Sequence, residues 1–130
     1  MQRLALFLGS AILGTVSLHA QGDYKFVKEA SEGGLAEVQL AQLAQQKAQN
    51  QAVKDFAQHM ISDHTKANDE LKAMAAGENM AVSTSLSVSD SALKVKLEAL
   101  SGAAFDKSYE RHDEGPPERY RGLREGSQEG

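Results

Sequence analysis

NQAVKDFAQHMISDHTKANDELKAMAAG, residues 50–77, carries the pattern that decides the fold of this chain. Its apolar residues and one histidine recur at steps of 4, 3, 4, 3, 4 and 3, at Val53, Ala57, Met60, His64, Ala67, Leu71 and Met74. This spacing indicates a helical seam, so one face of this helix is expected to pack against another helix. His64 occupies a seam position where an apolar residue is the usual choice.

A second amphipathic helix is expected before this stretch, from an N-cap at Asp23 to about Gln49. Gly33-Gly34 lies inside it, where each glycine costs about 1 kcal/mol relative to alanine. The pair permits the close approach of a neighbouring helix or a local kink, or it splits the element into two helices. We expect one helix, because the apolar face continues in phase on both sides of the glycines.

Capping residues predict where the remaining helices begin and end. Asn50 is expected to cap the helix over 50–77 after a short turn, so this helix and the preceding one should be antiparallel. Gly77 suits a left-handed residue at its end. After a linker, Ser87 or Ser89 should begin a third helix that ends at Ser101-Gly102, and residues 103–109 start a fourth.

Length and composition favour one small helical domain. The chain has 130 residues, no cysteine and no tryptophan, so no disulfide contributes to its stability. Met1–Ala20 contains one charge, Arg3, and an apolar run, which is the layout of a secretory signal peptide; an uncleaved N-terminal anchor is the alternative. Removal of the signal peptide, with Arg3, would change the net charge of the chain from −4 to −5, and this negative charge disfavours binding to nucleic acid. No further membrane span is expected.

Glu37 and His64 are the candidate site residues, because each is polar on an otherwise apolar face. They lie 13 residues before and 14 residues after Asn50, hence both about 20 Å from the turn of an antiparallel hairpin. A carboxylate that faces an imidazole can form a charge-assisted hydrogen bond or supply two ligands to a metal ion. We favour the first interpretation, in which Glu37 and His64 form a hydrogen-bonded pair that stabilises helix packing, over the metal site. His59 and Asp63, spaced i, i+4, are weaker metal candidates that lie off the seam.

Three segments together resemble a bacterial family of exported domains of unknown function, which are often called outer-membrane proteins and are regarded as ferritin-like. These are FVKEASEGGLAEVQLAQLA (26–44), VKDFAQHMISDHTKANDELKAMA (53–75) and LEALSGAAFDKSY (97–109). The resemblance covers about residues 23–109. It implies an up-down antiparallel bundle of four helices, and a second Asp-His motif on the last helix soon after Phe-Asp-x-x-Tyr.

The chain departs from this family after Tyr109, where no second Asp-His follows. Residues 110–130 are rich in charge, proline and glycine, which predicts a disordered tail and a truncated fourth helix. One set of codons that can encode residues 109–130, when read one base out of frame, encodes an amphipathic segment that contains Asp-His. We therefore hypothesise that this tail is the product of a frameshift. The missing helix should leave an apolar groove prone to self-association, lined by Phe26, Leu40, Met60 and Leu97.

Two functions are compatible with these features. The first is a non-enzymatic helical-bundle protein of the bacterial envelope, located in the periplasm or at the outer membrane, with an envelope protein or a small ligand as its partner. The second is a metal-binding or redox protein that uses a Glu/His centre. The sequence contains no nucleophile elbow, phosphate-binding glycine loop or zincin motif, which disfavours the common enzyme classes.

Overall fold

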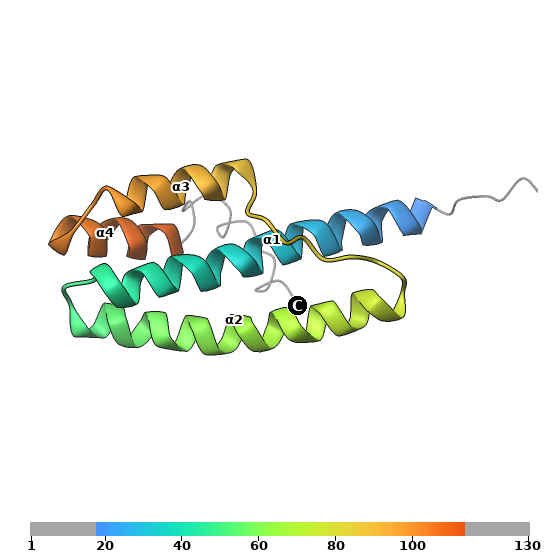
Figure 1. The fold of residues 1–130 in the computed structure, drawn as a ribbon, viewed down its shortest axis with the longest axis horizontal. Coiled ribbons are helices and arrows are strands. Elements are labelled where there is room, and N and C mark those ends of the chain that lie inside the picture. Colours follow the sequence, from blue (N-terminus) through green and yellow to red (C-terminus); the bar gives the residue numbers. More distant parts are fainter. Residues whose placement is uncertain (1–17, 114–130) are drawn as a thin grey trace, which may run out of the picture.

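The computed structural model describes residues 18–113, which form four helices: α1 (Leu18–Lys47), α2 (Gln51–Gly77), α3 (Val88–Glu98) and α4 (Gly102–Asp113). The helices run alternately up and down (Figure 1), so the predicted all-α bundle is confirmed. No helix in this part of the chain is long and apolar enough to cross a membrane. Most of the predicted signal peptide, residues 1–17, lies outside the described residues, and α1 begins within its last three.

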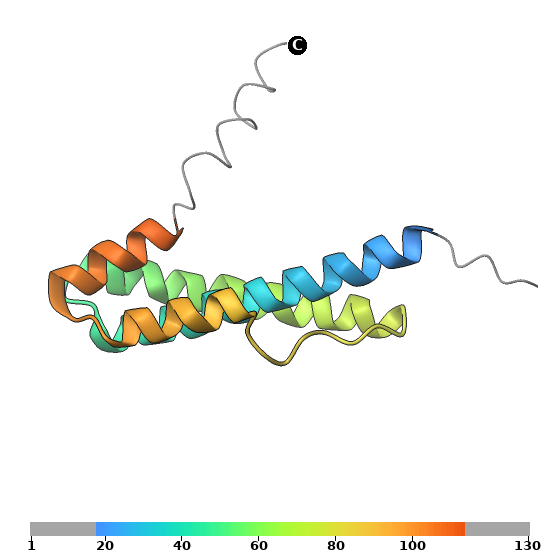
Figure 2. The ribbon, with the colours of Figure 1, turned by 90° about the horizontal axis from the view of Figure 1, so that it is seen from above.

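The bundle has a thick end and a thin end. α1 and α2 form a long antiparallel hairpin, and α3 and α4 cover the half of it that lies next to the turn (Figures 1 and 2). The α2–α3 connection, residues 78–87, runs back beside the hairpin, so α3 starts part of the way along it. We call the other half, residues 22–30 of α1 and 71–78 of α2 and its cap, the open end. No described helix covers it.

The core lies in the thick end and draws on all four helices. Alanines of α1 and α2 allow the two backbones to approach closely, and larger side chains of α3 and α4 pack on them. The buried cluster comprises Leu40, Ala41, Ala44, Ala48, Val53, Ala57, Leu97, Phe105 and Tyr109. Leu40 and Leu97 are fully buried in it. The prediction that they line an open groove was wrong, because α4 fills that position with Phe105.

The fourth helix also extends further than predicted. Residues 110–113 are helical, which contradicts the expectation that disorder begins at Glu110. Packing supplies the reason: Tyr109 stacks on Phe105, with ring centroids 6.0 Å apart, and meets Phe56 of α2 edge-on at 6.3 Å. These contacts hold α4 through its last turn although its sequence carries little apolar surface. The remainder of the predicted tail, residues 114–130, lies outside the described residues.

A buried carboxylate closes the α1–α2 turn. Asp106 of α4 accepts hydrogen bonds from the backbone N–H groups of Gln49, at 3.0 Å, and Asn50, at 2.8 Å. Asn50 caps α2 as predicted, since its side chain accepts from the backbone N–H of Ala52 at 2.9 Å. The Phe-Asp-x-x-Tyr motif thus has a structural explanation, with two aromatic core residues around one capping aspartate.

Helix α1 continues through Gly33-Gly34, as predicted, and the two glycines differ in their surroundings. A Cβ at Gly34 would lie 1.9 Å from Oδ1 of Asn68, whereas a Cβ at Gly33 would meet nothing within 4 Å. Gly34 therefore permits the close approach of α2 that was one of the predicted roles of the pair.

The end of α2 differs from the prediction at Gly77. This glycine is the last helical residue, and Asn79 adopts the left-handed conformation instead, with φ of 56°. The backbone N–H of Met80 then donates to the carbonyl of Ala75 at 2.7 Å. Asparagine tolerates positive φ better than most residues, so it can replace glycine in this role.

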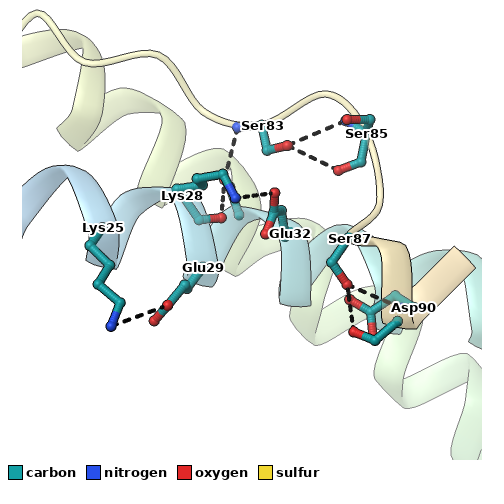
Figure 3. A network of polar contacts seen from close by, with 10 residues as sticks. Lys25, Lys28, Glu29, Glu32, Ser83, Ser85, Ser87 and Asp90 are labelled. Carbon is teal, nitrogen blue, oxygen red and sulfur yellow. Dashed lines mark hydrogen bonds and ion pairs between the residues drawn. The ribbon is translucent and has the colours of Figure 1, made fainter.

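Serines tie the α2–α3 connection to α1 and start α3. The backbone N–H of Ser83 donates to the buried hydroxyl of Ser31 at 2.8 Å (Figure 3). Ser83 also donates to the carbonyl of Ser85, and Ser87 accepts from the backbone N–H of Asp90 as the N-cap of α3. Of the two predicted starts of α3, Ser87 is confirmed as its N-cap, and the Ser83–Ser31 hydrogen bond joins the connection to α1.

Candidate functional site

Glu37, Tyr109 and His112 form a polar centre between the C-terminal part of α4 and the turn-side half of α1. Oε1 of Glu37 lies 3.6 Å from Nε2 of His112, and each side chain is about one quarter exposed (24% and 23%). This separation exceeds a hydrogen bond and is that of an ion pair when the imidazole is protonated. His112 was not among the predicted site residues. Its i, i+3 spacing from Tyr109 was the available signal, because it places both residues on one face of a helix.

The electrostatics of the centre favour protonated groups on α4. The Glu37 carboxylate raises the pKa of His112, against the lowering effect of burial, and the carboxylates of Asp90 and Asp113 act in the same direction as Glu37. Burial raises the pKa of the Tyr109 hydroxyl well above its usual value, and Glu37 and Asp113 raise it further. The phenol therefore keeps its proton at neutral pH and can serve as a hydrogen-bond donor.

Two polar atoms of this centre are buried without a hydrogen-bond partner among the described residues: the hydroxyl of Tyr109 and Nε2 of His112. Tyr109 is only 1% exposed. A buried polar atom without a hydrogen-bond partner destabilises the fold. The presence of two such atoms beside a carboxylate therefore points to a bound ligand, a water molecule or a strained packing position. Within residues 18–113, no three His, Cys, Asp or Glu side chains converge as a metal site.

The predicted partner of Glu37 was His64, which lies half-buried on α2. Gly34 of α1 meets Asn68 of α2. Glu37 lies three positions after Gly34 and His64 lies four positions before Asn68, so both are displaced toward the turn and lie at similar heights. The ion pair that the structure gives to Glu37 is with His112, and within residues 18–113 no hydrogen bond or ion pair joins Glu37 to His64. Direct pairing of those two residues stays a prediction. His59 and Asp63 are exposed on α2.

A second candidate site is an apolar groove of about 350 Å³ at the open end. It lies between α1, α2 and the start of the connection, and is lined by Asp23, Phe26, Val27, Leu71, Met74, Ala75, Glu78 and Met80. Phe26 is 62% exposed and Met74 is 64% exposed. Of the four residues predicted to line a groove, Phe26 does so. The groove itself arises because α3 and α4 stop short of this end.

Comparison with models of protein families identifies the family of this chain. A family model described as a domain of unknown function, DUF4142, matches residues 14–115. The chain belongs to this family. The match includes all four helices, and hence both the polar centre and the groove, and it continues six residues beyond Tyr109. Comparisons with curated proteins and with solved structures gave no significant match.

Proposed function

We propose that this protein is a non-enzymatic binding protein of the bacterial envelope and that it binds through the groove at the open end. The observation that carries the proposal is the pair of large apolar side chains, Phe26 and Met74, that line the groove while more than half exposed. The signal-peptide pattern of Met1–Ala20 supports export to the periplasm or the outer membrane. The up-down order of the helices supports a ferritin-like arrangement.

The lining of the groove suits binding better than catalysis. It offers apolar contact from both helices and two carboxylates, and its lining within residues 18–113 contains no serine, cysteine, histidine or lysine. Burial of a phenylalanine or methionine side chain contributes about 1.5–3 kcal/mol. Two such anchors supply a large part of the binding free energy of a modest protein or peptide complex.

A neutral apolar fluorescent probe, N-phenyl-1-naphthylamine, tests this proposal with the full chain. Binding should increase the probe's fluorescence, and Phe26→Ser and Met74→Ser should each weaken binding several-fold. Val95→Ser is the matched control, because Val95 is 66% exposed on α3 and does not line the groove. Unchanged melting temperatures would show that the variants fold. Equal losses in all three variants, or no binding by the wild type, would refute the proposal.

A second candidate function is metal binding at the polar centre. The 3.6 Å between Oε1 of Glu37 and Nε2 of His112 is close to the separation of two ligands that each lie about 2.1 Å from one ion. The buried Tyr109 hydroxyl, which lacks a hydrogen-bond partner among the described residues, adds a third candidate ligand at this centre. A divalent transition-metal ion is the class that such a nitrogen and oxygen set would bind.

Calorimetric titration with Zn²⁺ or Co²⁺ tests this candidate. Glu37→Gln and His112→Gln should each abolish the binding heat, whereas His59→Gln should retain it, because His59 is exposed on α2. Absence of binding, or equal binding by all three variants, would rule out the metal site and leave the centre with a structural role.

A further inference from the structure

We infer that the occupant of the groove at the open end is a basic amphipathic peptide segment of a partner protein. Its apolar side chains would lie against Phe26 and Met74, and its lysine or arginine side chains would face the carboxylates at the rim. This inference rests on the proposed function and specifies the chemistry of the partner.

The charged side chains that line the groove are both acidic. Asp23 belongs to α1, and Glu78 is the residue that follows α2, so carboxylates from the two helices border the same apolar surface. Among the residues that the structure describes, no lysine or arginine lines the groove. A partner with the opposite charge would therefore gain electrostatic complementarity as well as apolar contact.

The C-terminus of α2 adds further negative potential. A helix C-terminus carries a partial negative charge and usually attracts basic residues to its last turn. The last turn of α2 contains no basic residue, and Glu78, an acidic one, follows it. Two like charges thus meet at this point in the free protein, and a cation from a partner would offset both.

The nearest lysines of α1 are engaged elsewhere. Lys25 forms an ion pair with Glu29 at 3.6 Å, and Lys28 pairs with Glu32 at 2.9 Å (Figure 3). These i, i+4 pairs run along α1 and leave the carboxylate of Asp23 outside them. These two lysines of α1 are therefore occupied within their own helix.

The size of the groove suits a few side chains of a segment. A volume of about 350 Å³ is at the lower end of the range for ligand pockets, so it accommodates part of a peptide. Amphipathic segments commonly bind such surfaces by inserting residues spaced i, i+3 or i+4. The antiparallel helices α1 and α2 flank the groove on its two sides, which suits the binding of an amphipathic segment between them.

Two labelled amphipathic peptides test the inference, one with leucines and lysines, and one with the same leucines and glutamates. Fluorescence anisotropy with the full chain should show at least tenfold tighter binding of the lysine peptide at low salt, and the difference should shrink at high salt. The double variant Asp23→Asn, Glu78→Gln should remove most of this preference. The control Asp55→Asn, Glu110→Gln makes the same change in net charge on exposed residues outside the groove, and should retain it.

The outcomes separate this inference from the proposed function. Equal binding of both peptides, or a preference that the control variant reduces as much as the rim variant, would overturn the inference. If the neutral probe still binds in a manner that depends on Phe26, the groove remains a binding site without charge selectivity. If neither the probe nor the peptides bind, both proposals fail.

Discussion

Substitution of Asp106 by alanine tests whether α4 stabilises the α1–α2 turn. The substitution removes two hydrogen bonds from backbone N–H groups to a buried carboxylate, at 3.0 and 2.8 Å. Hydrogen bonds to charged groups contribute about 1.5–3 kcal/mol each. Gln49 and Asn50 are exposed, so water regains part of this energy. We expect Asp106→Ala to lower the free energy of unfolding by about 2–3 kcal/mol, which corresponds to a decrease in melting temperature of roughly 10–20 °C.

Urea and thermal unfolding, followed by far-ultraviolet circular dichroism, measure this effect. Asp106→Asn should cost about half as much, because it keeps one acceptor oxygen but turns an amide group toward a backbone N–H. Asp69→Ala is the control, since Asp69 is exposed on α2, and surface substitutions usually change stability by less than about 0.5 kcal/mol. If Asp106→Ala costs no more than the control, the carboxylate is not what holds the turn.

Three further predictions concern helix packing and the polar centre. Gly33→Ala, with open space around its Cβ, should stabilise the fold by up to about 1 kcal/mol, whereas Gly34→Ala should lose this gain because its Cβ would displace the side-chain amide of Asn68; urea unfolding of both variants checks this. The raised pKa of His112 stabilises the fold fully below the unfolded pKa near 6.5, and this contribution is lost as the pH rises through the folded pKa. Unfolding of wild type and His112→Gln at pH 5.5 and 8.5 should therefore show a stability difference that shrinks at the higher pH. Tyr109→Phe should be neutral or stabilising by up to about 1 kcal/mol in thermal unfolding, because it removes a buried hydroxyl that meets no hydrogen-bond partner among the described residues.

Local signals in the sequence were sufficient to predict most of the helical architecture. Asn50 and Ser87 start α2 and α3 because side-chain caps act within three residues of their partners. The heptad-spaced seam of α2 predicted its packing face near the turn, where Val53 and Ala57 are buried, but it was wrong further along the helix, where Met74 is exposed and Ala75 is buried instead. The in-phase face around Gly33-Gly34 predicted a continuous α1, since apolar periodicity reflects burial. Each of these features is encoded within one or two turns of helix.

Features that depend on distant parts of the chain were missed. The hydrogen bonds of Asp106 join residues 56 and 57 positions apart, and no local pattern distinguishes this aspartate from an exposed one. Distance from the turn predicts a partner for Glu37 on α2, but no local pattern indicates that α4 brings His112 to the same carboxylate. The length of α4 was underestimated because aromatic packing, rather than an amphipathic sequence, maintains its last turn.

The uneven thickness of the bundle implies a gradient in amide hydrogen exchange. Amides of α1 and α2 next to Asp106 lie under two further helices, so they should exchange slowly, close to the rate set by global unfolding. Amides near Val27 and Ala75 lie where the hairpin is covered by no described helix and should exchange through local opening. Protection acquired there on addition of a partner would identify the contact surface without any change to the sequence.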